Sequence, residues 1–194
     1  RIPSLTKILF NFNIKTTIFL LFHAKCFQFE LQLKFFETWY NRKRQNEWSD
    51  GMKGFVFFDL DGTLLNGESK VDVATAKAIQ TLKNNGYEPF IATGRSSAET
   101  RDIMESANIH SGIFMNGQVV LYQGKLVYSS EIPTETVKKF HQMVKEDGYG
   151  FTAYNEKEFY LVESTDGAKD AYGFIHTNPP ALNADFYIDN PINM

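Results

Sequence analysis

Two aspartates two positions apart follow an uncharged run of five residues. Asp59 and Asp61 come directly after Gly54–Phe58, and Gly62 and Thr63 come after them. A charge-free run of this length is typical of a strand buried on both faces, and open α/β sheets place functional groups at the carboxyl ends of such strands. Glycine allows a sharp turn, and a threonine hydroxyl can satisfy turn amides. The stretch therefore predicts a rigid base that presents two acids.

Three kinds of site carry acids at this spacing. A calcium loop counted from Asp59 needs glycine at position 6 and glutamate at position 12, but its glycine comes at position 4 and Lys70 at position 12. A turn with solvated acids is disfavoured by the apolar strand before the pair and the Gly-Thr-Leu-Leu after it. In covalent phosphoryl transfer, one carboxylate attacks phosphorus while a second protonates the leaving alcohol and later activates water. A divalent cation then offsets the repulsion among the anionic groups.

The run from Asp59 to Leu64 resembles the first motif of the haloacid dehalogenase superfamily of phosphatases, Asp-x-Asp-Gly-Thr-Leu/Val. By that resemblance Asp59 is the nucleophile and Asp61 the general acid/base. The resemblance also implies that Mg²⁺ is bound by the Asp59 carboxylate and the Asp61 backbone carbonyl. We therefore expect an aspartyl-phosphate intermediate and a small phosphorylated metabolite, such as a sugar phosphate, as the substrate.

From Met52 onward the chain alternates predicted strands and helices. After the first strand, the pattern predicts a helix that follows Asp72 and ends at Gly86, a strand at Tyr87–Ala92, a helix from about Ala98 to Ala107 and a strand at Gly112–Met115. This βαβαβ order predicts a parallel sheet with right-handed crossovers.

Polar residues follow the second and third predicted strands, as they follow the first. Thr93-Gly94-Arg95 comes after the second strand and Asn116-Gly117 after the third. The carboxyl ends of parallel strands meet at one edge, so we expect these residues near Asp59. A hydroxyl and the amides around Gly94 suit phosphate oxygens, and the Arg95 fork could bind a phosphate or carboxylate of the substrate. A helix cap for Thr93, a surface ion pair for Arg95 and a plain turn for Asn116-Gly117 remain alternatives.

Ala92–Arg95 also resembles the second motif of the Cof-type, sugar-phosphatase-like branch of the superfamily, in which the threonine binds the phosphoryl group. Asn116-Gly117 matches another feature of that branch, and the resemblance covers about Met52 to Tyr128. It implies an α/β fold, a Rossmann-like parallel-sheet core of which residues 52–131 are the N-terminal half. The sequence contains no late Gly-Asp-x-x-Asn-Asp motif, and Lys169 is a candidate for the cation that the family requires. We therefore expect an incomplete core, the N-terminal portion of a phosphatase.

The alternation of predicted strands and helices ends after Asn116. From there the pattern predicts a β-hairpin around Gln123-Gly124, then an amphipathic helix from Thr134 with Val137, Phe140 and Val144 inward, and then strands at Gly150–Tyr154 and Glu158–Val162. This is an α+β arrangement, which places a domain boundary near Ile132. By resemblance, residues 132–194 are the start of a cap domain that closes over the site and selects the substrate.

Residues 1–51 show no sustained hydrophobic period. We expect an extension that is foreign to the native protein or disordered, with no part in the βαβ core. A membrane anchor and a partner-binding amphipathic helix are the alternatives. The apolar stretch from Ile8 to Ala24 is a poor membrane span because it contains Lys15 and His23.

Composition excludes some partners. A net charge of −3 over 194 residues provides no basic field for nucleic acid, and one cysteine, Cys26, excludes an internal disulfide. Both features fit a cytoplasmic protein. A phosphate-receiver domain is excluded because its third strand would end in the acceptor aspartate, whereas here it ends in Asn116. Two function classes remain: a magnesium-dependent phosphomonoester hydrolase, and a catalytically incomplete fragment or pseudoenzyme that acts as a binding module.

Overall fold

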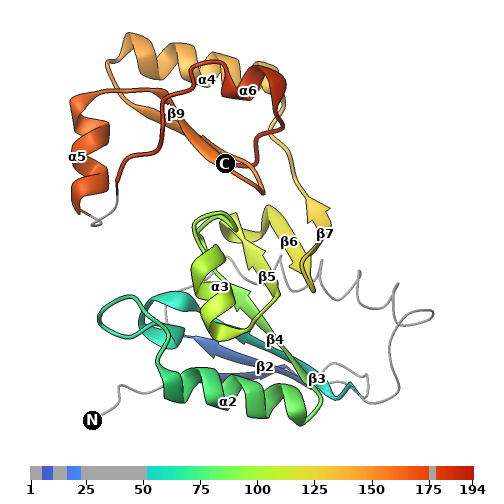
Figure 1. The fold of residues 1–194 in the computed structure, drawn as a ribbon. Coiled ribbons are helices and arrows are strands. Elements are labelled where there is room, and N and C mark those ends of the chain that lie inside the picture. Colours follow the sequence, from blue (N-terminus) through green and yellow to red (C-terminus); the bar gives the residue numbers. More distant parts are fainter. Residues whose placement is uncertain (1–5, 11–16, 23–51, 175–177) are drawn as a thin grey trace.

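The computed structural model describes residues 6–10, 17–22, 52–174 and 178–194. Seven strands form one sheet in sequence order, and a smaller second unit lies beyond its β7 end (Figure 1). The strands of the large sheet are β1 (Thr6–Phe10), β2 (Thr17–Phe22), β3 (Gly54–Phe58), β4 (Tyr87–Ala92), β5 (Ser111–Phe114), β6 (Val119–Tyr122) and β7 (Lys125–Ser129).

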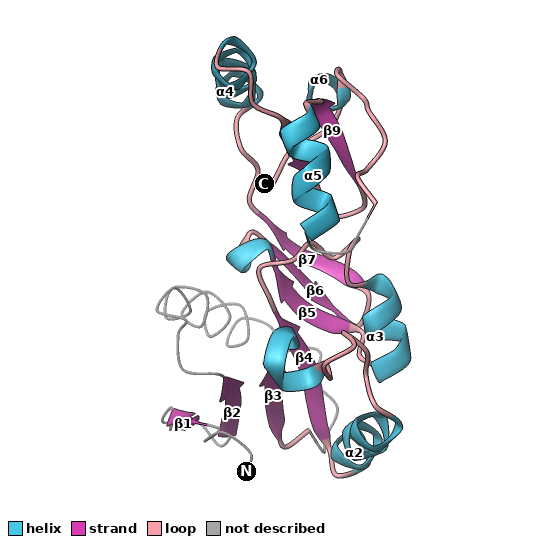
Figure 2. Ribbon diagram, turned by 90° about the vertical axis from the view of Figure 1, so that its left-hand side faces the viewer, coloured by secondary structure: helices cyan, strands magenta, loops and turns pink. Residues whose placement is uncertain are grey.

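The centre of the sheet is parallel. Strand β3 pairs with β4, and β4 with β5, through the helices α2 (Val73–Asn84) and α3 (Arg101–Ala107). Both helices lie on the same face of the sheet (Figure 2), as right-handed crossovers between successive neighbours require. The predicted βαβαβ unit is confirmed. The predicted hairpin also forms, since β6 and β7 are antiparallel and turn at Gln123 and Gly124, both with positive φ.

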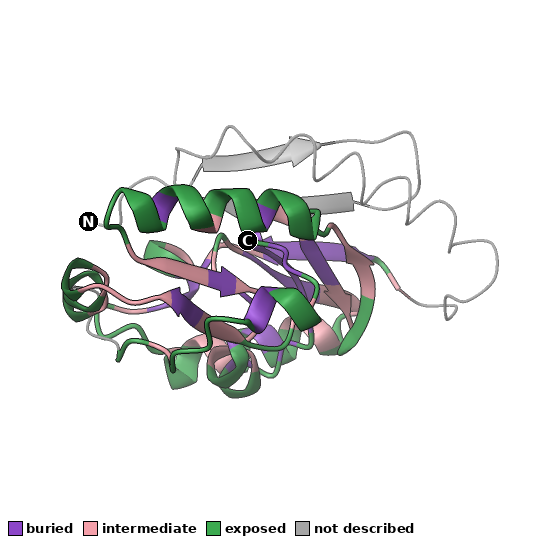
Figure 3. Cartoon of the chain, turned by 90° about the horizontal axis from the view of Figure 1, so that it is seen from above, coloured by how far each residue is buried: buried purple, intermediate pink, exposed green. Residues whose placement is uncertain are grey.

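Apolar side chains fill both faces of the central strands. The rings of Phe55 and Phe57 lie with centroids 5.4 and 5.0 Å from that of Phe90, and all three are fully buried. The helix-covered face holds a second cluster. Its members come from the loop after β3, from both helices and from the ends of β4 and β5, and include Leu60, Leu64, Ile79, Ile91, Ile109 and Met115. Buried residues concentrate on the strands, while the helices expose their outer faces (Figure 3).

The second unit, residues 132–194, has a core of its own. It contains α4 (Thr134–Glu146), the antiparallel pair β8 (Phe151–Tyr154) and β9 (Phe159–Glu163), α5 (Asp166–Phe174) and α6 (Phe186–Asp189). Val137, Ala153 and Phe186 are among its buried residues. The helix and the strand pair were predicted from the sequence, whereas α5 and α6 were not.

The buried face of α4 differs from the prediction at one position. Val137 and Val144 are buried as expected, but Phe140 is 47% exposed. His141 points inward instead, with Nδ1 3.2 Å from the Tyr187 hydroxyl and Nε2 3.2 Å from a Glu163 oxygen. Two polar partners on neighbouring elements therefore decide which side of the helix turns inward.

The N-terminal segment also differs from the prediction. We expected no part for residues 1–51 in the sheet, but β2 pairs in parallel with all of β3, and β1 pairs with β2. The physical reason is that β3 has an edge that can accept a strand, and Thr17–Phe22 is a run of strand-forming residues. Most of residues 1–51 lie outside the described residues, and so do residues 11–16, 23 and 24 of the stretch considered as an anchor. Within the described ranges, none of the helices has the length and apolar character that a bilayer span requires.

Deleting residues 1–51 tests the pairing of β2 with β3. We expect a chain that starts at Met52 to melt at a lower temperature and to aggregate, because β3 loses β2, one of its two parallel partners, and exposes an edge. Circular dichroism melting and size-exclusion chromatography of the two chains would measure this. Equal melting and elution would instead favour the sequence-based expectation that the segment is dispensable.

The stability of the second unit is expected to depend on pH through Glu163. The hydrogen bond from His141, together with Lys145 at 3.4 Å, lowers the pKa of Glu163 below its ordinary 4.5 although burial acts in the opposite direction. A carboxyl with a lowered native pKa stabilises the fold above its unfolded pKa, and this contribution disappears as pH falls through the native pKa.

The variant Glu163→Gln should therefore be less stable than the wild type at pH 7, and the difference should shrink as pH falls below 4.5. Urea unfolding of both proteins at several pH values between 7 and 3 measures this difference in the free energy of unfolding. Glu135→Gln, on the exposed side of α4, is the matched control. A difference between wild type and Glu163→Gln that stays constant from pH 7 to pH 3 would contradict the assignment.

Candidate active site

The loop after β3 places the two aspartates. Asp59 follows the strand in an extended conformation, Asp61 is also non-helical, and Gly62 has a φ of 77°. Leu60 and Leu64 are buried in the helix-side core and anchor the loop from within. With the leucines inward, the side chain of Asp61 is 62% exposed at the end of the strand. The glycine is required here because other side chains rarely adopt its positive φ.

The ends of β4 and β5 are joined directly by backbone hydrogen bonds. The Thr93 amide donates to the Ile113 carbonyl at 3.0 Å, and the Met115 amide donates to the Arg95 carbonyl at 3.0 Å. The Asn116 amide donates to the Thr93 carbonyl at 3.4 Å. The structure thus brings the two polar turns together at one edge of the sheet.

Within these turns, small groups lie against each other. A Cβ on Gly94 would be 3.1 Å from Asn116 Oδ1, so the amide of Asn116 covers the glycine. The Thr93 hydroxyl oxygen accepts the Arg95 amide at 3.1 Å, which leaves the hydroxyl hydrogen as a donor. Asn116 and Gly117 have φ values of 53° and 98°, as expected of residues that tolerate the left-handed region.

Arg95 forms a two-pronged ion pair with Asp61. Its Nη2 lies 2.5 Å from Oδ1 and its Nε 3.2 Å from Oδ2. The pair is largely exposed, with 37% of the Arg95 side chain and 62% of the Asp61 side chain accessible. The sequence left open whether Arg95 is a ligand for substrate or a member of a surface ion pair. In this structure it is in an ion pair, and the partner is the predicted acid/base residue.

The donor types at this edge suit magnesium, but they are few. Mg²⁺ is usually held by one or two carboxylates, substrate phosphate and waters. The Asp59 carboxylate and the Asp61 carbonyl fit that description, whereas the Asp61 carboxylate is held by Arg95. Thr63 Oγ1, in the same loop, is buried and has no hydrogen-bond partner among the described residues. Within the described part of the chain, no three His, Cys, Asp or Glu side chains are grouped for a metal.

Lys169, the candidate for an additional cation, lies in α5. Its Nζ is 3.5 Å from the Asp166 carboxylate, one helical turn away. Helix α5 belongs to the second unit and is far from β3 in both views (Figures 1 and 2). The structure therefore does not bring Lys169 to Asp59.

Sequence reasoning missed the loop that follows Arg95. The Glu99 carboxylate accepts hydrogen bonds from the amide and the hydroxyl of Ser96, both at 2.8 Å. The available signal was Ser96–Glu99, a serine followed three residues later by glutamate, which is typical of a helix start.

Comparisons with a family profile, with curated proteins and with solved structures point to the same family. The profile of a family described as haloacid dehalogenase-like hydrolase matches residues 56–193. The chain is 32% identical over 91 residues to YkrA of Bacillus subtilis (strain 168). That alignment covers 47% of this chain and 35% of YkrA. The chain is also 27% identical over 123 residues to the HMP-PP phosphatase of Yersinia pestis (strain Pestoides F), covering 57% of this chain and 44% of that protein.

Solved structures share the fold. A protein from Geobacillus kaustophilus HTA426 superposes with a TM-score of 0.67 at 24% identity, over 71% of this chain and 54% of that one. The subclass IIB sugar phosphatase BT4131 gives a TM-score of 0.57 at 26% identity, over 71% and 55%. The chain thus spans less than half of these two curated relatives and slightly more than half of the two solved chains.

The exposure of the Arg95 ion pair predicts a small contribution to stability. We expect Arg95→Met to change the free energy of unfolding by less than about 1 kcal/mol, because exposed pairs rarely contribute more. Urea denaturation would measure it, with Lys70→Met, which removes the exposed pair with Glu68, as the control. A loss of several kcal/mol would show that the pair is part of the folded core.

Proposed function

Because the chain belongs to the haloacid dehalogenase-like hydrolases, and within them to the Cof-type branch, we propose that it carries the nucleophile-bearing half of a magnesium-dependent phosphomonoester hydrolase. One observation carries the proposal. Asp59 and Asp61 follow a buried parallel strand, and the polar turns after the next two strands are hydrogen-bonded to each other at the same edge. This arrangement supports acceptance and transfer of a phosphoryl group.

In the proposed reaction, an Asp59 oxygen attacks the phosphorus of a monoester. The bond between phosphorus and the leaving oxygen breaks, Asp61 protonates that oxygen, and an aspartyl-phosphate remains. Asp61, now a base, takes a proton from water, which attacks the same phosphorus and releases Asp59 and inorganic phosphate. Magnesium, when bound by the Asp59 carboxylate and the Asp61 carbonyl, would neutralise charge on the phosphoryl group.

The neighbouring turns have binding roles in this proposal. The Thr93 hydroxyl and the amides near Gly94 would donate to phosphoryl oxygens, and Asn116 and Gly117 would close the side of the pocket. Arg95 would bind an anionic group of the substrate. Because both Asp61 oxygens accept from Arg95 in this structure, Arg95 must move before Asp61 can donate a proton.

The proposed substrate is a small phosphorylated metabolite in the cytoplasm. Two similar proteins support this class, since one is named an HMP-PP phosphatase and the other a sugar phosphatase. Residues 132–194 would be the start of the cap that selects the substrate, with 52–131 as the N-terminal half of the core. A closed cap would exclude water from the first step.

A second proposal, a catalytically incomplete binding module, rests on a specific observation. The described residues provide no third carboxylate for the metal, and Arg95, the cation of the site, is paired with Asp61. A phosphate dianion beside Asp59 would then face repulsion that a single shared guanidinium offsets only in part. The two proposals differ in whether this chain turns over a phosphate ester.

We expect the 194-residue chain to hydrolyse an aryl phosphate in excess magnesium slowly or not at all. The metal would have few protein ligands, and the phosphate would be poorly neutralised. Release of inorganic phosphate, followed beside Asp59→Asn, is the measurement. Sustained turnover that disappears in Asp59→Asn would contradict this expectation and show that this chain carries a working site.

The same assay with a chain extended to the length of its relatives tests the residue roles. There Asp59→Asn should abolish turnover, whereas Asp61→Asn should slow it by about 10²- to 10⁴-fold, the range of general acid/base groups. Wild-type rates in either variant would overturn the assignment.

A further inference from the structure

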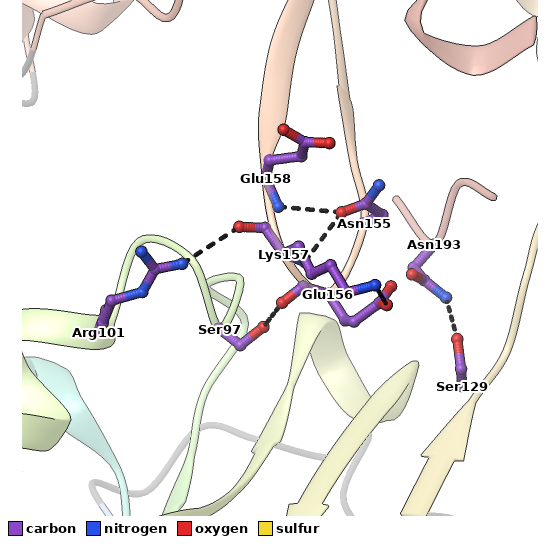
Figure 4. A network of polar contacts seen from close by, with 8 residues as sticks. All are labelled: Ser97, Arg101, Ser129, Asn155, Glu156, Lys157, Glu158 and Asn193. Atoms are coloured by element: carbon purple, nitrogen blue, oxygen red, sulfur yellow. Dashed lines mark hydrogen bonds and ion pairs between the residues drawn. The ribbon is translucent and has the colours of Figure 1, made fainter. Parts of the chain in front are cut away.

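The second unit touches the core at a place far in sequence from its connection to β7. The turn between β8 and β9 rests on the loop that runs from Ser96 to Arg101 (Figure 4). Tyr154, at the end of β8, packs against the core cluster that contains Leu60 and Leu64. Those leucines anchor the Asp59 loop, so the second unit contacts the layer that supports the candidate site.

The β8–β9 turn has a fixed shape because of Asn155. This side chain is 4% exposed, and its Oδ1 accepts the amides of Lys157 and Glu158, both at 2.9 Å. The Asn155 amide in turn donates to the Glu158 carbonyl at 3.0 Å. Three amides of the turn are satisfied internally, while the carbonyls of Glu156 and Lys157 face the core.

The core supplies matching donors. Ser97 Oγ donates to the Glu156 carbonyl at 2.5 Å, and Arg101 Nη2 donates to the Lys157 carbonyl at 3.4 Å. Ser97 is 7% exposed, so its hydroxyl would lose a partner if the turn moved away. Its loop is held independently of the turn, since Thr100 Oγ1 donates to the carbonyls of Ser96 and Ser97.

The other end of the second unit is attached differently. Asn193 Nδ2 donates to Ser129 Oγ at 2.9 Å and to the Ser130 carbonyl at 2.7 Å. The Ile132 amide donates to the Ile192 carbonyl at 2.7 Å. These bonds surround the covalent connection from β7 to α4. The contact at Ser97 is therefore distinct from the contacts that surround the covalent connection.

We propose that Ser97 and Asn155 form a latch that holds the second unit against the core by recognising the main chain of the β8–β9 turn. Asn155 shapes the turn, Ser97 binds its Glu156 carbonyl, and Arg101 adds a weaker contact. The acceptors are backbone carbonyls, so the latch does not depend on the side chains at positions 156 and 157. The latch concerns how the two units are held, and it stands whether or not the chain hydrolyses phosphate esters.

The distance between the two units tests the latch directly. Pulsed electron paramagnetic resonance measures the distribution of distances between two spin labels, one on each unit. The labels are attached at Lys77→Cys on α2 and Lys138→Cys on α4, in the full chain with Cys26→Ser. Both label positions are exposed. Ser97→Ala and Asn155→Ala should each raise the ratio of separated to docked molecules about two- to tenfold, the effect of losing one hydrogen bond.

Three variants separate the latch from general loosening. Asn155→Asp keeps an oxygen that accepts both amides and should restore the docked distribution. Lys157→Ala keeps the backbone carbonyl, and Ser106→Ala removes a hydroxyl that bonds only within α3, so both should match the wild type. If Asn155→Ala loses its native circular dichroism, Ser97→Ala decides alone. Wild-type distances in Ser97→Ala, or equal loosening in Lys157→Ala, would overturn the proposal.

Discussion

The parallel pairing of β3, β4 and β5 is the constraint on which the candidate site depends. Right-handed crossovers through α2 and α3 force the three strands to run in one direction, so their carboxyl ends share one edge. The hydrogen bonds between the turns after β4 and β5 then fix those two ends against each other. Acids, hydroxyl and amide come from separate parts of the chain, yet their placement follows from this one topology.

The site loops are irregular, and the core compensates for that irregularity. Gly62, Met115, Asn116 and Gly117 all have positive φ, which for residues other than glycine costs free energy. Leu60, Leu64 and Met115 are buried in the cluster directly beneath. Burial of each such side chain contributes about 1.5–3 kcal/mol, enough to offset one strained residue. The apolar members of these loops therefore hold them against the core.

Local pattern predicted most elements, while contacts between distant residues escaped prediction. The strands β3 to β9 could be read from apolar runs and turn residues, since both signals are local. The Arg95–Asp61 pair could not, because it joins side chains 34 positions apart and either could have had another partner. The same holds for His141, which displaces Phe140 from the inner face of α4 for partners on β9 and α6. The pairing of β2 with β3 escaped for a similar reason, since periodicity in one segment says nothing about an available edge elsewhere.

Charge balance at the sheet edge relates the ion pair to the proposed chemistry. Asp59, Asp61 and a bound phosphate dianion would together bring about four negative charges, against the single guanidinium of Arg95. In the present structure that guanidinium neutralises Asp61, so a phosphate could recruit it only by leaving Asp61 uncompensated. Lys169, the other candidate cation, is paired with Asp166 in α5. In the proposed reaction, a divalent ion and a further cationic group would supply the positive charge that Asp59, Asp61 and the phosphate call for.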